Sequence, residues 1–436
     1  MAGYTGGCSN LRTNERSNCH PGYNPTRLAG STFPCRALDA ARNGQNMKIL
    51  QVSPFDFNAR GGVNEHVIQL DGAFRSLGLE TRILAASSPE YGELDDGHLY
   101  RLGTAIPFPS NGSTARVTVS PFVISKVRSF LEREQFNVIH VHEPLAPVLP
   151  MAALLFSKAL NVATFHAARE FNFWYHYIKA VMDIFVDRID CRVAVSQVAR
   201  DSVDSHFPGS YEIVPNGIDL DRFRPDVEPI YRYMDGKQNI LFVGRFDEPR
   251  KGFIHLLRAM PIIRTQFPKS RLIVVGKGDI QRAFEQVDNL KLTNIEFVGA
   301  VRPADLPRYY ATSDVYCAPS TGRESFGIVL LEALATGTPV VASNIPGYAG
   351  VVEHGETGIL TKPADPQSLA LSIVRVLADE KLRHGLRMNG LREVQRFGWN
   401  VVARRLLSVY EHGLARERPV RDTGTIPEAL LERARG

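Results

Sequence analysis

Residues 317–346, CAPSTGRESFGIVLLEALATGTPVVASNIP, decide the fold. This stretch predicts a buried strand, a loop, a helix that begins near Phe326 and ends at Gly337, and a second buried strand. Ser325 is expected to cap the helix, because its hydroxyl can accept a hydrogen bond from a free N–H group of the first turn. The segment therefore reads as one strand–helix–strand unit of a parallel sheet.

Two carboxylates, Glu324 and Glu332, lie eight residues apart in this segment. Between them, the backbone N–H groups of Phe326 and Gly327 would form a seat for a phosphate at the N-terminus of the helix. Carboxylates repel phosphates, so we expect each glutamate to accept hydroxyl hydrogen bonds, one from a sugar and one from a ribose. Most glutamate pairs at this spacing are solvated helix residues, but the surrounding Gly-Arg-Glu-Ser-Phe-Gly favours a binding site.

The same alternation of strands and helices extends over most of the chain. Short apolar strands are predicted at 48–53, 81–85, 138–141, 162–165, 192–195 and 212–214, and then at 239–243, 272–275, 295–297, 315–318 and 340–342. Each is followed by a loop or a helical pattern, which is typical of a doubly wound parallel sheet. We predict an α/β protein with two Rossmann-like domains that face each other across a cleft.

The predicted domain boundaries follow from this pattern. They comprise a disordered tail at 1–46, an N-terminal Rossmann-like domain at 47–222, a C-terminal Rossmann-like domain at 223–398, a helix at 399–415, and a flexible tail at 416–436.

Composition limits the classes of function. The chain has 436 residues and a formal net charge of +5, of which the two predicted tails carry most, and this argues against a general nucleic-acid binder. Its five cysteines include no CxxC pair, so neither a zinc site nor a disulfide framework is indicated. With no apolar run of membrane-spanning length and no secretory signal, we expect a reduced, cytoplasmic protein.

Two further segments could hold a diphosphate. Gly61 and Gly62 follow the first strand and precede a helix, where a glycine backbone can approach a phosphate. Arg245 and Lys251 occupy the matching place in the second half. Fixed cations there could stabilise the negative charge of a phosphate group.

The E-x7-E segment and this cation pair resemble the retaining glycosyltransferases of family 4, which have the GT-B fold. The likeness extends from about Met47 to Glu411. It implies that the domain at 47–222 binds the acceptor, that the domain at 223–398 binds the nucleotide sugar, and that the helix at 399–415 crosses back to the first domain. Within the family, the chain is most similar to the phosphatidylinositol mannosyltransferases, which use GDP-mannose.

The resemblance implies roles for particular residues. His166, at the end of a predicted strand, would lie beside the transferred sugar without acting as a general base, since in these enzymes the leaving phosphate takes the acceptor proton. The implied catalytic residues are His166, Arg245, Lys251 and Glu324, and the implied donor-binding residues are Gly61, Gly62, Arg245, Lys251, Glu324, Ser325, Phe326, Gly327, Ile328 and Glu332.

No metal is predicted at this site. Asp219 and Asp221 form a DxD sequence, but it lies in a predicted interdomain turn, so we interpret it as an Asx-type turn and helix cap. His140 and His142 could suggest a metal pair; we expect the two rings to point to opposite faces of their strand and therefore reject it.

The acceptor side departs from the family pattern. The acceptor-binding positions implied by the resemblance are Phe55, Asn58, Asn64 and Leu145, where the phosphatidylinositol mannosyltransferases carry Tyr, Asp, Gln and Asn. Residues 120–136 form an amphipathic, basic helical pattern, which fits either a peripheral contact with the inner face of a membrane or packing on its own domain.

We therefore predict a retaining, metal-independent hexosyltransferase without a cofactor. It would move mannose from GDP-mannose to a hydroxyl of a small-molecule, glycan, lipid or polyol acceptor. The alternatives are a UDP-sugar-dependent enzyme of the same family and a catalytically idle sugar-nucleotide-binding subunit.

Overall fold

The computed structural model describes residues 47–58, 61–88, 92–110, 113–166 and 173–417. The predicted tail at 1–46 and residues 418–436 lie outside the described residues.

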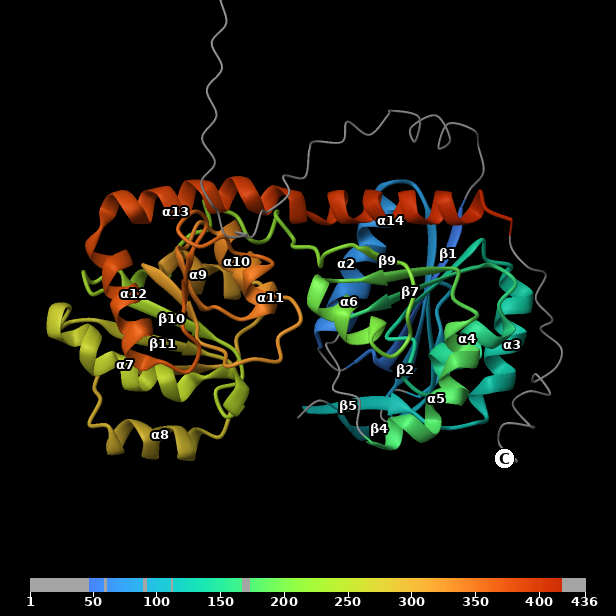
Figure 1. Cartoon of the computed structure of the whole chain (residues 1–436), viewed down its shortest axis with the longest axis horizontal. Coiled ribbons are helices and arrows are strands. Elements are labelled where there is room, and N and C mark those ends of the chain that lie inside the picture. Colours follow the sequence, from blue (N-terminus) through green and yellow to red (C-terminus); the bar gives the residue numbers. More distant parts are fainter. Residues whose placement is uncertain (1–46, 59–60, 89–91, 111–112, 167–172, 418–436) are drawn as a thin grey trace, which may run out of the picture. The chain divides into compact units, whose positions relative to one another are not determined.

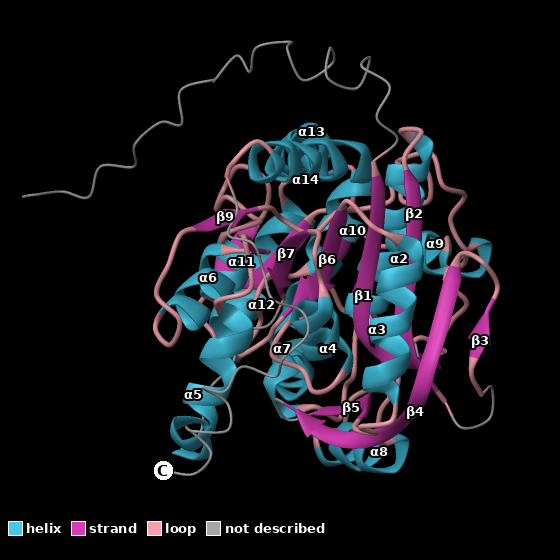
Figure 2. Ribbon diagram, turned by 90° about the vertical axis from the view of Figure 1, so that its right-hand side faces the viewer, coloured by secondary structure: helices cyan, strands magenta, loops and turns pink. Residues whose placement is uncertain are grey.

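The first sheet is built around β1. Its strands are β1 (Lys48–Asp56), β2 (Glu80–Ser87), β3 (Leu94–Asp95), β4 (Leu99–Ser110), β5 (Ser113–Thr118), β6 (Val138–His142), β7 (Leu160–Phe165), β8 (Cys191–Ala194) and β9 (Tyr211–Ile213). β1 pairs in parallel with β2 on one side and with β6 on the other, and β7, β8 and β9 follow β6 in parallel (Figure 2). The chain therefore reverses its direction of winding between β1 and β6.

The second sheet repeats this plan with all strands parallel. Its order is β12 (Ile295–Gly299), β11 (Arg271–Val275), β10 (Asn239–Val243), β13 (Val315–Ala318), β14 (Val340–Ser343) and β15 (Ile359–Thr361). Side chains of β10 alternate between two apolar clusters, with Ile240 and Phe242 on one face and Leu241 on the other. Both faces are thus buried, as a doubly wound sheet requires.

Helices cover the sheets (Figure 1). They are α2 (Gly62–Ser76), α3 (Val123–Glu134), α4 (Leu149–Phe156), α5 (Phe173–Val186), α6 (Gln197–Asp204), α7 (Phe253–Gln266), α8 (Ile280–Asn289), α9 (Leu306–Thr312), α10 (Ile328–Ala335), α11 (Pro346–Ala349), α12 (Pro366–Ala378), α13 (Glu380–Glu393) and α14 (Trp399–Leu414). Short 3-10 turns occur at Tyr231–Tyr233, Pro249–Lys251 and Val394–Phe397.

Three parts of the sheets were not predicted. One is the two-residue strand β3, which pairs antiparallel with β4. The hairpin of β4 and β5 pairs antiparallel and meets β1 at a single position, Phe55 opposite Val117. β15 has three residues and pairs in parallel with β14. The predicted strands are all present, and their ends differ from the observed ones by at most three residues.

The last helix returns to the first sheet, as predicted. α14 packs against α2, β7 and β8, with Val402, Ala403, Leu406 and Tyr410 buried (Figure 1). No helix among the described residues is long and apolar enough to cross a membrane.

Candidate functional site

The loops that follow β10 and β13 flank the switch point of the second sheet. These two strands are neighbours, but the chain continues from β10 to β11 on one side and from β13 to β14 on the other. In doubly wound sheets, ligands bind at the carboxyl ends of the strands where the winding reverses. Residues on these two loops are therefore the first candidates for a site.

A compact ion cluster joins the two loops. The Glu324 carboxylate accepts hydrogen bonds from Lys251 Nζ at 2.6 Å and from Arg250 Nη1 at 2.8 Å. All three side chains are less than one-third exposed, so the charges are only partly screened by water. The carboxylate is held in place, and two cations lie on the side where an anion could bind.

The helix behind Glu324 begins later than predicted. α10 starts at Ile328, its N-cap is Gly327, and no side chain caps it, so the predicted capping by Ser325 and the start at Phe326 are wrong. Gly327 has a φ of 106°, a left-handed backbone conformation that glycine adopts without steric cost. The turn at Gly327 separates Ser325 and Phe326 from the helix, whose first N–H groups follow Gly327.

Glu332 lies in a different environment from Glu324. Its carboxylate is buried on α10 and accepts a hydrogen bond of 2.7 Å from the Tyr310 hydroxyl. Burial raises the pKa of Glu332 to about 7, while the Tyr310 hydrogen bond and the charge of Arg222 act in the opposite direction. This carboxyl group exchanges its proton near neutral pH.

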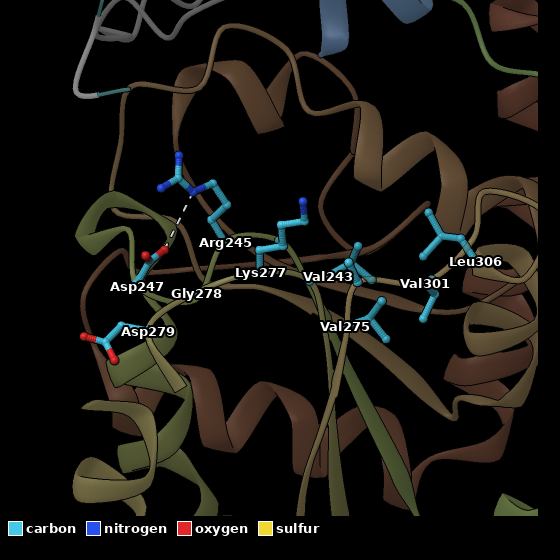
Figure 3. A pocket seen from close by; sticks show the side chains of 12 residues that line it. Val243, Arg245, Asp247, Val275, Lys277, Gly278, Asp279, Val301 and Leu306 are labelled. Atoms are coloured by element: carbon cyan, nitrogen blue, oxygen red, sulfur yellow. Dashed lines mark ion pairs between the residues drawn. The ribbon is translucent and has the colours of Figure 1, made fainter. Parts of the chain in front are cut away.

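A cavity of about 660 Å³ opens at the ends of β10, β11 and β12 (Figure 3). Its apolar side chains come from Val243, Val275, Val301 and Leu306, and Arg245 and Lys277 stand at its rim. The glycines of the loops after β10 and β11 bring the two backbones together; a Cβ atom at Gly276 would lie 1.9 Å from the carbonyl oxygen of Gly244. The two loops therefore form a closely packed backbone floor beside the apolar side chains.

Arg245 and Lys251 occupy different parts of this region. The Arg245 side chain is 55% exposed and its Nε lies 3.7 Å from a carboxylate oxygen of Asp247 (Figure 3). Lys251 forms an ion pair with Glu324. Arg250 pairs with the same carboxylate, although the sequence did not single it out. Its place beside Lys251 was the one hint in the sequence, because Glu324 is 74 residues away in the chain.

His166 lies at the switch point of the first sheet, within a group of buried histidines. Its Nε2 is 3.0 Å from Nδ1 of His142, and its ring packs edge-on against His66, with centroids 4.7 Å apart. The backbone N–H of His166 donates to the Glu143 carboxylate at 2.9 Å. Burial lowers the pKa of His166 to about 3, so the imidazole is neutral at pH 7.

The expected orientation of His140 and His142 was wrong. Residues two apart in a strand share one face, and these two rings stack with centroids 4.3 Å apart. Among the described residues, His66, His142 and His166 also form a group that could hold a metal ion. The interpretation of Asp219 as a turn residue is confirmed: its carboxylate accepts from the N–H groups of Asp221 and Arg222.

The glycine pair stands at the N-terminus of α2. Gly61 is the N-cap and Gly62 the first helical residue, and a Cβ atom at either position would meet no atom of the described residues within 4 Å.

The predicted acceptor positions lie near the end of β1 or in the core. The Asn64 amide is buried between Ser53 and the backbone carbonyl of Asp56, and Asn58 accepts a hydrogen bond from Arg101 at 3.0 Å. Phe55 is half-buried, and Leu145 belongs to the apolar core of the first sheet. The structure therefore gives Asn64 and Leu145 packing roles.

The amphipathic segment at 120–136 forms α3. Its apolar residues Val123, Val127, Phe130 and Leu131 are buried, and α3 packs against α4. Phe122, just before the helix, is 83% exposed. The apolar stripe of α3 thus serves its own domain.

Family models match both halves of the chain. The model described as Glycosyltransferase Family 4 matches residues 60–222, and the model described as Glycosyl transferases group 1 matches residues 226–393.

Curated relatives match over nearly their whole length. A phosphatidyl-myo-inositol mannosyltransferase of Mycobacterium leprae is 38% identical over 84% of this chain and 96% of its own. The protein of the same name from Mycolicibacterium smegmatis is 36% identical over 84% and 94%. A D-inositol 3-phosphate glycosyltransferase of Jonesia denitrificans is 27% identical over 80% and 91%.

Solved structures support the GT-B fold. A glycosyltransferase from Rickettsia africae superposes with a TM-score of 0.70 at 21% identity, covering 86% of this chain and 100% of its own. A sucrose-phosphate synthase from Thermosynechococcus elongatus gives 0.66 at 24% identity, covering 84% and 98%.

Proposed function

The chain belongs to glycosyltransferase family 4, with the phosphatidyl-myo-inositol mannosyltransferases as relatives, and from this premise we propose that it transfers mannose from GDP-mannose to a lipid or polyol hydroxyl. The family models and the solved structures confirm the prediction from the sequence that the chain is a glycosyltransferase with the GT-B fold. The proposal of mannose transfer rests on the 38% identity to a phosphatidyl-myo-inositol mannosyltransferase, of which 96% of the length is covered.

The donor would bind along the carboxyl edge of the second sheet. The cavity at the ends of β10, β11 and β12 fits a base and ribose, because it combines apolar side chains with a closely packed backbone floor. Arg245 and Lys251 would hold the diphosphate, with Glu332 on the ribose. Glu324 would accept hydrogen bonds from the sugar hydroxyls, and its pairing with Lys251 and Arg250 supports this role by fixing the carboxylate.

Electrostatics would drive the chemical step. As the bond between the sugar and the diphosphate breaks, negative charge grows on the leaving phosphate, and Arg245, Lys251 and the helix N-termini near Gly62 and Gly327 stabilise it. The acceptor attacks the face that the diphosphate leaves, and the leaving phosphate takes the acceptor proton, so the anomeric configuration is retained. His166 would contact the sugar as a neutral imidazole, consistent with its lowered pKa.

A radiolabel assay tests the donor and the acceptor together. Purified full-length protein is incubated with GDP-[14C]mannose and vesicles containing phosphatidylinositol, with and without EDTA, and parallel reactions contain UDP-glucose or free inositol phosphate. We expect label in the lipid fraction from GDP-mannose, and no loss of rate with EDTA.

Each other outcome removes one part of the proposal. Transfer from the UDP sugar alone would overturn the mannose assignment. Label in inositol phosphate but not in lipid would overturn the lipid acceptor and favour the activity named for the Jonesia relative. Thermal stabilisation by GDP-mannose without transfer to any acceptor would favour the idle binding subunit.

A further inference from the structure

Three buried histidines from three elements converge at the carboxyl edge of the first sheet. His66 comes from α2, His142 ends β6, and His166 follows β7. Each offers a ring nitrogen, and these three nitrogens lie within 4.8 Å of one another. The proposed transfer reaction uses His166 and leaves the other two rings unexplained.

Hydrogen bonds identify which nitrogen of His66 carries a lone pair. In a neutral imidazole, one ring nitrogen carries a hydrogen and the other carries a lone pair. Nδ1 of His66 lies 2.9 Å from Oδ1 of Asn216, and an amide oxygen only accepts. Nδ1 therefore carries the hydrogen, and Nε2 of His66 is left with a lone pair.

That lone pair of His66 has no partner among the described residues. The neighbouring His140 differs, because its Nδ1 lies 2.6 Å from the Tyr410 hydroxyl and its Nε2 lies 2.6 Å from the Thr164 hydroxyl. A buried polar atom without a partner destabilises the fold. The cluster around His66 is thus incomplete where its neighbour is fully paired.

We propose that His66, His142 and His166 bind a transition-metal cation of the Zn²⁺ class. Neutral imidazole nitrogens are preferred ligands of zinc, cobalt, nickel and copper, whereas magnesium and calcium prefer oxygen. A cation also satisfies several lone pairs at once in a site with few donors.

Metal binding would need small adjustments. Two nitrogens about 2.0 Å from a tetrahedral zinc are separated by about 3.3 Å, and the His142 and His166 nitrogens that face each other are 3.0 Å apart. One of these two nitrogens carries the hydrogen that joins them, so that hydrogen would move to the other nitrogen of its own ring when the metal binds. His66 would have to approach the pair. Asn216 already holds its ring by the distal nitrogen, which is the outer-shell arrangement that orients a metal-ligating histidine. Three protein ligands leave a fourth position for a water molecule.

A metal ion bound at this site would slow the transfer reaction. This consequence rests on the proposed function, in which His166 contacts the sugar: a cation bound to His166 would take that side chain away from the donor. Micromolar Zn²⁺ should therefore slow transfer, and a chelator should restore it.

Cobalt binding tests the site without reference to activity. The full-length protein, freed of metal with a chelator, is titrated with Co²⁺, and we expect visible absorption of a tetrahedral ion at one equivalent, displaced by Zn²⁺. His66→Asn keeps an N–H donor toward Asn216 and removes the Nε2 ligand, so it should abolish this absorption. His384→Ala, at an exposed histidine, should leave it unchanged.

A second variant covers the case in which His66→Asn does not fold. Asn216→Ala removes the outer-shell partner of His66 and should weaken cobalt binding by about 10–100-fold. Absence of cobalt absorption in the wild-type protein would overturn the proposal and indicate a buried water in its place. Absorption that persists in His66→Asn would do the same.

The transfer assay separates the two proposals. Cobalt absorption together with transfer that Zn²⁺ does not slow would confirm the metal site and overturn the placement of His166 beside the sugar.

Discussion

The two sheets share one winding plan but carry opposite chemistry at the same place. At the switch point of the second sheet, Lys251 and Arg250 enclose the Glu324 carboxylate with fixed charges. At the switch point of the first sheet, burial holds the imidazoles of His66 and His166 neutral. The common topology supplies a position, and the residue types decide what binds there: charge suits a diphosphate, and neutral rings suit hydroxyl groups.

The largest expected effect is a decrease in the free energy of unfolding at acidic pH. We expect the first sheet to lose its structure before the second. His140 and His166 have pKa values of about 3 in the fold, compared with about 6.5 in an unfolded chain. The unfolded state thus binds more protons between these values, and stability falls as the pH drops below about 6.5. Each histidine contributes about 1.4 kcal/mol per pH unit, and His66 and His142 act in the same direction.

Hydrogen exchange followed by mass spectrometry between pH 5 and 8 measures this difference. After correction for the intrinsic exchange rate, peptides from β6 and β7 should lose protection as the pH falls, before peptides from β10 and β13. An equal loss in both sheets would show that the histidine cluster does not set the acid limit.

Replacement of Glu324 by Gln tests the charged switch point. The amide keeps the shape but loses the charge that pairs with Lys251 and Arg250, and we expect transfer to fall by about 100–1,000-fold, the usual cost of losing one preorganised contact in a transition state. Glu285→Gln, at an exposed position of α8, is the matched control. Initial rates and melting temperatures are measured together; a Glu324→Gln protein that is stable and active would remove this carboxylate from the site.

These residues also show how far sequence reasoning reaches. The parallel strands followed from apolar runs, but β4 was missed because it contains Pro107 and Pro109 and lacks an apolar run. Ser325 looked like a cap because local pattern cannot show that Gly327 turns the chain. The pairing of Arg250 with Glu324 depends on two loops that only the sheet order brings together. Local patterns therefore selected the loops of the candidate site, and tertiary contacts decided which side chains meet there.

Glu332→Gln sharpens the contrast between the two carboxylates. The fold raises the pKa of Glu332 from 4.5 to about 7, so the folded state binds more protons between these values and stability decreases as the pH rises through them. Above pH 7 the buried carboxylate costs about 3 kcal/mol. The glutamine can still accept from Tyr310 without a charge.

Urea unfolding at pH 5 and pH 8 checks this expectation. The Gln variant should be more stable than the wild-type protein by about 1–3 kcal/mol at pH 8 and nearly equal to it at pH 5. A variant that is less stable at pH 8 would mean that the Glu332 carboxylate is compensated in the fold and that its pKa is not raised.

The smallest expected effect is a difference in kinetics between variants of Arg245 and Arg250, which lie in the same loop. Arg250 contacts Glu324 directly, whereas Arg245 is 55% exposed at the rim of the cavity. Arg250→Ala should lower kcat by about tenfold with little change in the KM for the donor, because it loosens the carboxylate that we propose to contact the reacting sugar. Arg245→Ala should raise the donor KM, because its cation would meet the diphosphate only when the nucleotide binds. If both variants changed KM alone, Arg250 would be a second phosphate ligand, and the Glu324 carboxylate would be held by Lys251 without it.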